Sequence, residues 1–155
     1  MRLRDLIPEG ETAEIGSFHF SAEVIIAFAE KYDPHFFHVD AEKAKQSLFG
    51  GLCASGWQVC AVAMKCNVEY MQSQAARLIA AGQEPPKIGP SPGVKNLRWI
   101  KPVFAGDTIR YSLTNLGSTP SPNRPGRQVC TALFEGVNQN GEPVMRFEGS
   151  VIEFD

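Results

Sequence analysis

Hydrophobic positions in the first third of the chain follow a helical period. Within residues 22–32, the apolar side chains that fall on one helical face are Val24, Ile25, Phe28 and Tyr32. Ser21 precedes them as a suitable N-cap, and Pro34 disfavours helical backbone at the residue before it. The sequence therefore predicts an amphipathic helix that ends at Asp33.

A second and longer helix is predicted from Leu52 to Gly82. Two seven-residue series of apolar or small side chains run along it: Leu52, Val59 and Cys66 in one, and Gly56, Ala63 and Tyr70 in the other. A helix that is apolar or small-sided over so much of its surface is expected to be enclosed by the rest of the protein. Gly82 suits its C-terminus. Before this helix, Asp40 is expected to cap a short helix over residues 41–47.

In the second half of the chain the pattern changes to alternation. β-Branched and aromatic residues are frequent in four segments, which are residues 94–104, 107–117, 127–139 and 144–155. Turn-forming residues separate these segments, so we expect four long strands in an antiparallel meander. Residues 17–20 add a short early strand. At least five strands and one long helix predict an α+β fold.

Length and composition limit the classes of protein to consider. The chain has 155 residues, with 15 Lys and Arg against 17 Asp and Glu, and 43% of its residues are hydrophobic. These values favour one globular domain over residues 1–155 and argue against nucleic acid as a partner. No apolar run is long enough for a membrane span, and the N-terminus lacks the apolar stretch of a signal peptide. We therefore expect a cytoplasmic protein with no membrane partner.

Two of the three histidines lie in one short segment, which the pattern predicts to be a loop. This segment brings together Asp33, His35, His38 and Asp40. One interpretation is a solvated loop in which Asp33 caps backbone amides. A second is a metal site, for which Pro34 and two phenylalanines make a poor cage. The third is a carboxylate and an imidazole that act together on a water molecule. The four cysteines show no CxxC spacing and are expected in the core.

The same segment resembles the catalytic segment of the MaoC-like dehydratases, the family of the (R)-specific enoyl-CoA hydratases. That family has the form Asp-x-Asn-Pro-x-His-x-Asp, followed by a glycine at the start of the long helix. Asp33, His38, Asp40 and Gly51 match it, and residues 102–107 resemble its Pro-Val-x-x-Gly-Asp signature. His35 and Phe36 stand where the family has Asn-Pro. The departure leaves the loop conformation and the substrate preference open.

The resemblance implies a hotdog fold, in which an antiparallel sheet wraps around one helix, and a homodimer or larger even oligomer. It implies an (R)-type enoyl-thioester hydratase or dehydratase with Asp33 and His38 as its acid–base pair. Gly51, expected at the helix N-terminus, would offer its amide to the thioester oxyanion. Ser55 is a candidate for substrate binding or a first-turn residue, and His35 is expected to take no chemical part.

No metal or redox cofactor is expected. The acyl group would arrive on CoA or on an acyl carrier, and this thioester is then the substrate and not a cofactor. Two other functions stay open. A hotdog thioesterase would also use a carboxylate and a helix-end amide, although it does not need the Asp33 to His38 spacing. A subunit that only binds acyl thioesters would need neither side chain.

Overall fold

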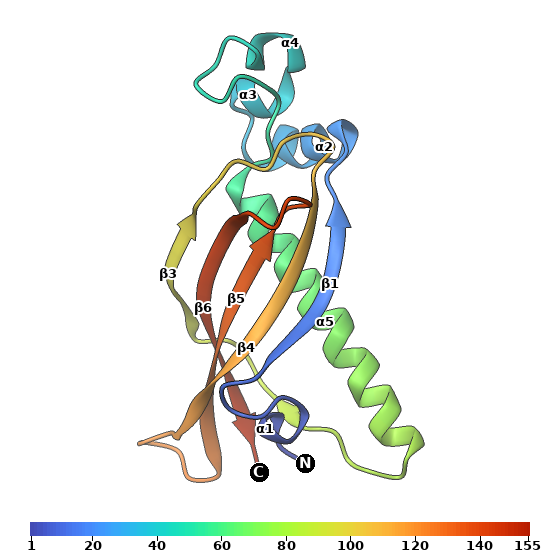
Figure 1. The fold of residues 1–155 in the computed structure, drawn as a ribbon. Coiled ribbons are helices and arrows are strands. Elements are labelled where there is room, and N and C mark those ends of the chain that lie inside the picture. Colours follow the sequence, from blue (N-terminus) through green and yellow to red (C-terminus); the bar gives the residue numbers. More distant parts are fainter.

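The computed structural model describes residues 1–155, and its centre is a six-stranded antiparallel sheet that curls around one long helix (Figure 1). The strands are β1 (Thr12–His19), β2 (Lys87–Ile88), β3 (Gly93–Trp99), β4 (Thr108–Pro120), β5 (Arg127–Val137) and β6 (Pro143–Phe154). The helices are α1 (Leu3–Leu6), α2 (Ala22–Tyr32), α3 (Phe36–Val39), α4 (Ala41–Ala44) and α5 (Gly56–Ala80). The predicted hotdog fold is confirmed.

The strand order corrects the predicted four-strand meander. Only β4, β5 and β6 follow one another as neighbours, in the order β1-β4-β5-β6-β2. β3 does not pair with β4, the next strand in the chain; it pairs antiparallel with β6, beside β2. β1 takes the free edge of β4 and is longer than the early strand predicted at residues 17–20. Strand pairing over such separations depends on long-range contacts that local patterns do not record.

The core lies between the concave face of the sheet and the first half of α5. The buried side chains on the sheet include Ile109, Tyr111 and Met145, which are at most 1% exposed. Tyr111 also donates its hydroxyl to the carbonyl oxygen of Val59 at 2.9 Å, which joins the sheet to the helix. Because alternate residues of a strand face opposite sides, one face of β4 contributes Ile109, Tyr111 and Leu113 to this core.

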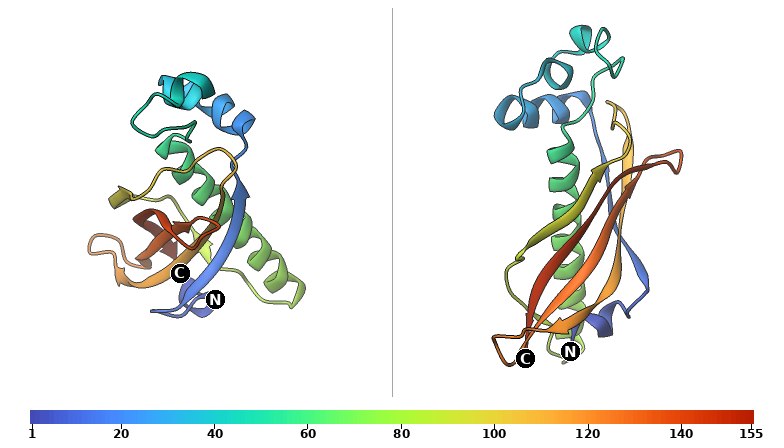
Figure 2. Two further views of the ribbon diagram at one scale, coloured as in Figure 1. Left: turned by 45° about the horizontal axis from the view of Figure 1, so that its top comes forward. Right: turned by 90° about the vertical axis from the view of Figure 1, so that its left-hand side faces the viewer.

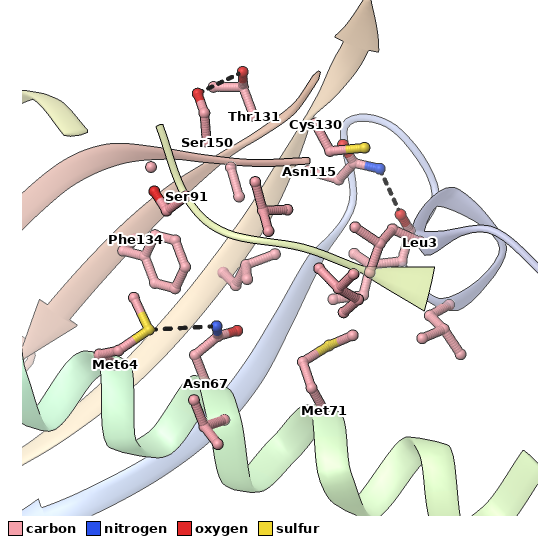
Figure 3. Close-up of a pocket in the computed structure, with 18 of the residues that line it drawn as sticks. Leu3, Met64, Asn67, Met71, Ser91, Asn115, Cys130, Thr131, Phe134 and Ser150 are labelled. Atoms are coloured by element: carbon pink, nitrogen blue, oxygen red, sulfur yellow. Dashed lines mark hydrogen bonds between the residues drawn. The ribbon is translucent and has the colours of Figure 1, made fainter. Parts of the chain in front are cut away.

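The prediction that α5 is enclosed is correct only for its first half. Its buried residues are Gln58, Val59, Val62, Ala63 and Cys66. Beyond Cys66 no residue of the helix is buried, and a cavity of about 630 Å³ lies between the sheet and the side of the helix that carries Met64 and Met71 (Figure 3). Most of the residues that line this cavity are hydrophobic, and α1 contributes to its lining through Leu3 and Leu6. No helix is both long and apolar enough to cross a membrane.

The helices α2, α3 and α4 form a group at one end of the molecule, beside the N-terminus of α5 (Figures 1 and 2). α2 has the predicted bounds, and the hydroxyl of Ser21 accepts the amide of Val24 at 3.2 Å as the predicted N-cap. Asp40 caps α4, as predicted, by accepting the amides of Glu42 and Lys43 at 3.0 Å. The group therefore holds residues 33–40 close to the start of the long helix.

Candidate active site

Asp33 lies where α2 ends. Its amide donates the last hydrogen bond of the helix to the carbonyl oxygen of Ala29 at 2.9 Å, and Pro34 stops the helix at the next residue, as predicted. The side chain is largely buried. No backbone or side-chain N–H of the chain donates a hydrogen bond to its carboxylate with regular geometry, so both oxygens are available to other partners.

His38 does not lie in a loop, as the sequence predicted, but in α3, and its side chain is buried. Its Nδ1 lies 2.6 Å from the carbonyl oxygen of Cys53. Because a carbonyl oxygen only accepts hydrogen bonds, Nδ1 carries the proton and donates it. In the neutral ring, Nε2 is therefore the unprotonated nitrogen and can accept a proton.

The two side chains expected to form the acid–base pair lie next to each other. Nε2 of His38 is 3.4 Å from Oδ2 of Asp33. Both atoms are acceptors when the carboxylate is ionised and the ring is neutral, so the contact is favourable only with a shared proton or a bridging water molecule. This geometry suits the transfer of a proton between the two side chains.

The segment before α5 sets the orientation of His38. Cys53 forms an isolated β-bridge with Phe104, and its amide donates to the carbonyl oxygen of Phe37 at 3.1 Å. The Cys53 thiol lies 3.7 Å from Nδ1 of His38. Burial, and secondarily the charge of Asp33, raise the pKa of this thiol to about 11. At neutral pH the thiol is therefore protonated, and it does not compete as a nucleophile.

The β-bridge also corrects the predicted start of the long helix. α5 begins at Gly56, so Gly51 lies five residues before the helix and not at its N-terminus. The amide of Gly51 forms no hydrogen bond within the chain and remains available to a ligand. Ser55 is the N-cap, is 0% exposed, and accepts the amide of Trp57 at 3.3 Å. Its helix-capping role is thus established, whereas substrate binding by Ser55 stays a prediction.

Trp99 covers the start of α5, a contact that the sequence pattern did not predict. Its Nε1 donates to the carbonyl oxygen of Gly56 at 3.0 Å, and its ring meets that of Trp57 edge to face at 5.0 Å. Both tryptophans are about half exposed. The indole lies so close to Gly56 that a Cβ there would be 2.4 Å from a ring atom. A larger residue at this position would require the indole of Trp99 to shift.

We therefore expect Gly56→Ala to lower the free energy of unfolding by about 1–3 kcal/mol, the usual cost of overpacking. Helix propensity alone would favour alanine, so a decrease would identify the clash with Trp99 as the dominant effect. Urea denaturation measures the change. Gly51→Ala is the matched control, because the nearest atom to its Cβ would be 3.7 Å away. Equal stability of the two variants would contradict the expected clash.

Three contacts at the site were not predicted from the sequence. The Cys53 carbonyl orients His38, Phe37 packs against both imidazoles of the segment, and His35 approaches Asp33. The spacing of two residues between Asp33 and His35 was the one available signal. All four cysteines are free, and no three His, Cys, Asp or Glu side chains are arranged to hold a metal ion. The apolar cavity under α5 lies toward the other end of that helix (Figures 1 and 3).

Comparison with known proteins extends these observations. The family described as "MaoC like domain" matches residues 9–131. The uncharacterized protein YdeM of Bacillus subtilis is 31% identical over 143 residues, which make up 92% of either chain. The crystal structure of the MaoC-like dehydratase from Rhodospirillum rubrum is 35% identical, with a TM-score of 0.78 over 99% of this chain and 97% of that one. Mesaconyl-CoA hydratase of Cereibacter sphaeroides is 40% identical over 50 residues, which are 32% of this chain and 14% of that protein.

Proposed function

Because the chain belongs to the MaoC like domain family, we propose that it is an (R)-type enoyl-thioester hydratase or dehydratase, which adds water reversibly to an α,β-unsaturated acyl-CoA. One observation carries the proposal. The unprotonated Nε2 of His38 faces Oδ2 of Asp33 at 3.4 Å, and the free amide of Gly51 lies two residues before Cys53, whose carbonyl oxygen binds His38. The similarity to a mesaconyl-CoA hydratase agrees with this reaction class.

In the proposed reaction, a water molecule contacts both the His38 ring and the Asp33 carboxylate from one side of the pair. Its oxygen bonds to the β-carbon while one of its protons passes to one member of the pair. The other member gives a proton to the α-carbon, so the pair holds the same number of protons before and after the reaction. The Gly51 amide donates to the thioester oxygen, on which negative charge builds in between. No metal or redox cofactor takes part in this proposal.

We further propose that the protein acts as a homodimer or larger even oligomer. β3 pairs with β6 along one edge, and its other edge carries unpaired backbone groups. Large apolar side chains are exposed on β3 and on the adjacent face of α5: Val94, Trp99, Trp57, Met64 and Val68. A second copy paired along β3 would extend the sheet and cover this stripe, in a two-fold arrangement with two equivalent sites.

A charge on the free edge of β3 tests the oligomer. We expect Val94→Glu to shift the protein toward monomer in sedimentation velocity and to lower its activity in parallel, because a glutamate would be desolvated at the interface. Leu116→Glu is the matched control, since Leu116 is also exposed but lies on β4. A fully active monomer, whether from this variant or from dilution of the wild type, would refute the proposal.

An assay with crotonyl-CoA tests the proposed reaction against its alternatives. Hydration removes the enoyl absorbance and releases no thiol. A thioesterase would release free CoA thiol, which a thiol reagent detects. A protein that only binds acyl thioesters would change neither signal. Loss of enoyl absorbance without thiol release is the result we expect.

A further inference from the structure

We propose that His35 is a positioning residue for the acid–base pair: in its protonated form it binds Oδ1 of Asp33, so that Oδ2 faces His38 and the pair is hindered from taking up a second proton. The proposal rests on the proposed function of Asp33 and His38. It differs from the expectation from sequence that His35 takes no chemical part, which no observation has tested. Nε2 of His35 lies 3.7 Å from Oδ1 of Asp33, while Nε2 of His38 lies 3.4 Å from Oδ2.

The local backbone brings His35 and Asp33 together. Pro34 is the one residue between Asp33 and His35, and His35 has extended backbone as the N-cap of α3. The chain therefore leaves α2 and enters α3 within two residues, which keeps the two side chains close. Pro34 stiffens this step because its ring restricts φ. Each oxygen of the Asp33 carboxylate therefore faces its own imidazole.

Phe37 holds both imidazoles in place. The His35 ring stacks on the Phe37 ring with a centroid distance of 5.3 Å and an interplanar angle of 14°. The His38 ring meets the same phenyl ring edge to face at 4.6 Å. Although the His35 side chain is 70% exposed, this stacking gives it a preferred orientation toward Asp33. A segment with asparagine at position 35 lacks this stacking on Phe37, because asparagine has no ring.

The charge balance around Asp33 gives protonated His35 an electrostatic role. Asp33 follows the C-terminus of α2, where the helix dipole disfavours a negative charge. No lysine or arginine forms an ion pair with it, so the two imidazoles are the only side chains in contact with it that can carry a positive charge. The other titratable groups nearby are Cys53, which is a neutral thiol, and Asp40, whose carboxylate accepts two amides of α4.

The sign of the effect follows from the number of protons on the pair. The pair is active with one proton, and on the acid side it gains a second. A positive charge on His35 opposes the uptake of this second proton. It therefore moves the acid limb of the pH profile of kcat/KM to lower pH. An imidazole that has lost its proton carries no charge and exerts no such effect. His35 therefore widens the active pH range on its acid side only.

Activity profiles of two variants test this proposal. His35→Gln keeps an N–H donor at a similar reach but never carries charge. We expect the acid limb of kcat/KM to move to higher pH by about half a unit, the size of an exposed ion pair, with the alkaline limb unchanged. High salt should cause the same shift in the wild type and none in the variant. His35→Ala should also lower the plateau of kcat, by up to about tenfold.

His19→Gln is the matched control, because His19 is bonded to Thr108 on β4 and lies outside the site. It should leave both limbs unchanged. Identical acid limbs in the wild type and His35→Gln would overturn the proposal. A uniform fall in kcat without a shift in the limb would also overturn it, because that result indicates a structural role alone.

A second measurement works without substrate and so separates this proposal from the proposed reaction. The ring resonances of His35 and His19 are followed by NMR against pH in the wild type and in Asp33→Asn. We expect the midpoint for His35 to fall in the variant and that for His19 to stay the same. An unchanged His35 midpoint would show that the two side chains do not interact in solution, even if the protein proves to be a hydratase.

Discussion

Replacement of His38 by alanine is expected to lower the hydration rate of crotonyl-CoA by at least about a hundredfold, the lower range for the loss of a positioned acid or base. The variant loses Nε2, the one unprotonated ring nitrogen that faces Asp33. The enoyl absorbance assay measures the loss. A near-wild-type rate would refute the assignment of His38 to the reaction.

The alanine variant needs a stability control, because His38 is buried and donates to the Cys53 carbonyl at 2.6 Å. Loss of that bond leaves a buried acceptor unpaired, at a cost of about 1–3 kcal/mol. His38→Asn keeps an N–H donor on a shorter side chain and should fold with a smaller loss. If both variants keep native circular dichroism and neither hydrates crotonyl-CoA, the loss is chemical.

Asp33→Asn is expected to reduce hydration to a similar degree, again by at least about a hundredfold. The substitution is nearly isosteric and keeps the backbone bond from residue 33 to Ala29, so α2 should end as before. The amide can neither take up nor carry the exchangeable proton of the pair. Steady-state kinetics with crotonyl-CoA measures the effect.

Asp5→Asn is the control for Asp33→Asn, since Asp5 lies in α1 at the other end of the molecule. It should hydrate crotonyl-CoA at the wild-type rate. If Asp33→Asn also hydrated crotonyl-CoA at the wild-type rate, the Asp33 carboxylate would have no part in the reaction and would only be a polar group at the end of α2. The solvated-loop interpretation of the segment would then be the correct one.

Local sequence signals predicted the elements whose determinants lie within one segment. The bounds of α2 follow from Ser21 and Pro34, and the cap of α4 follows from Asp40. Gly82 ends the long helix as predicted, with a φ of 74°. Each of these depends on a hydrogen bond or a steric restriction between residues at most four apart. Local clustering identified Asp33, His35, His38 and Asp40 as candidates, and the resemblance to the MaoC-like dehydratases selected Asp33 and His38 among them.

Tertiary contacts decided what local spacing could not. β3 pairs with β6 and not with β4, and α5 begins at Gly56 because residues before it bond to the segment around Phe104. Because α5 begins later than predicted, Gly51 does not lie at the helix N-terminus. Such contacts join residues some fifty apart, whose meeting depends on the whole sheet.

In the candidate site, too, the sequence determined some features and the tertiary structure determined others. The sequence by itself determined which side chains the segment offers, and Pro34 determined that they follow a helix end. The tertiary structure decided which nitrogen of His38 carries the proton, because that depends on the Cys53 carbonyl fifteen residues away. A ring tautomer is set by the partner of its other nitrogen, and that partner is present only once the chain has folded.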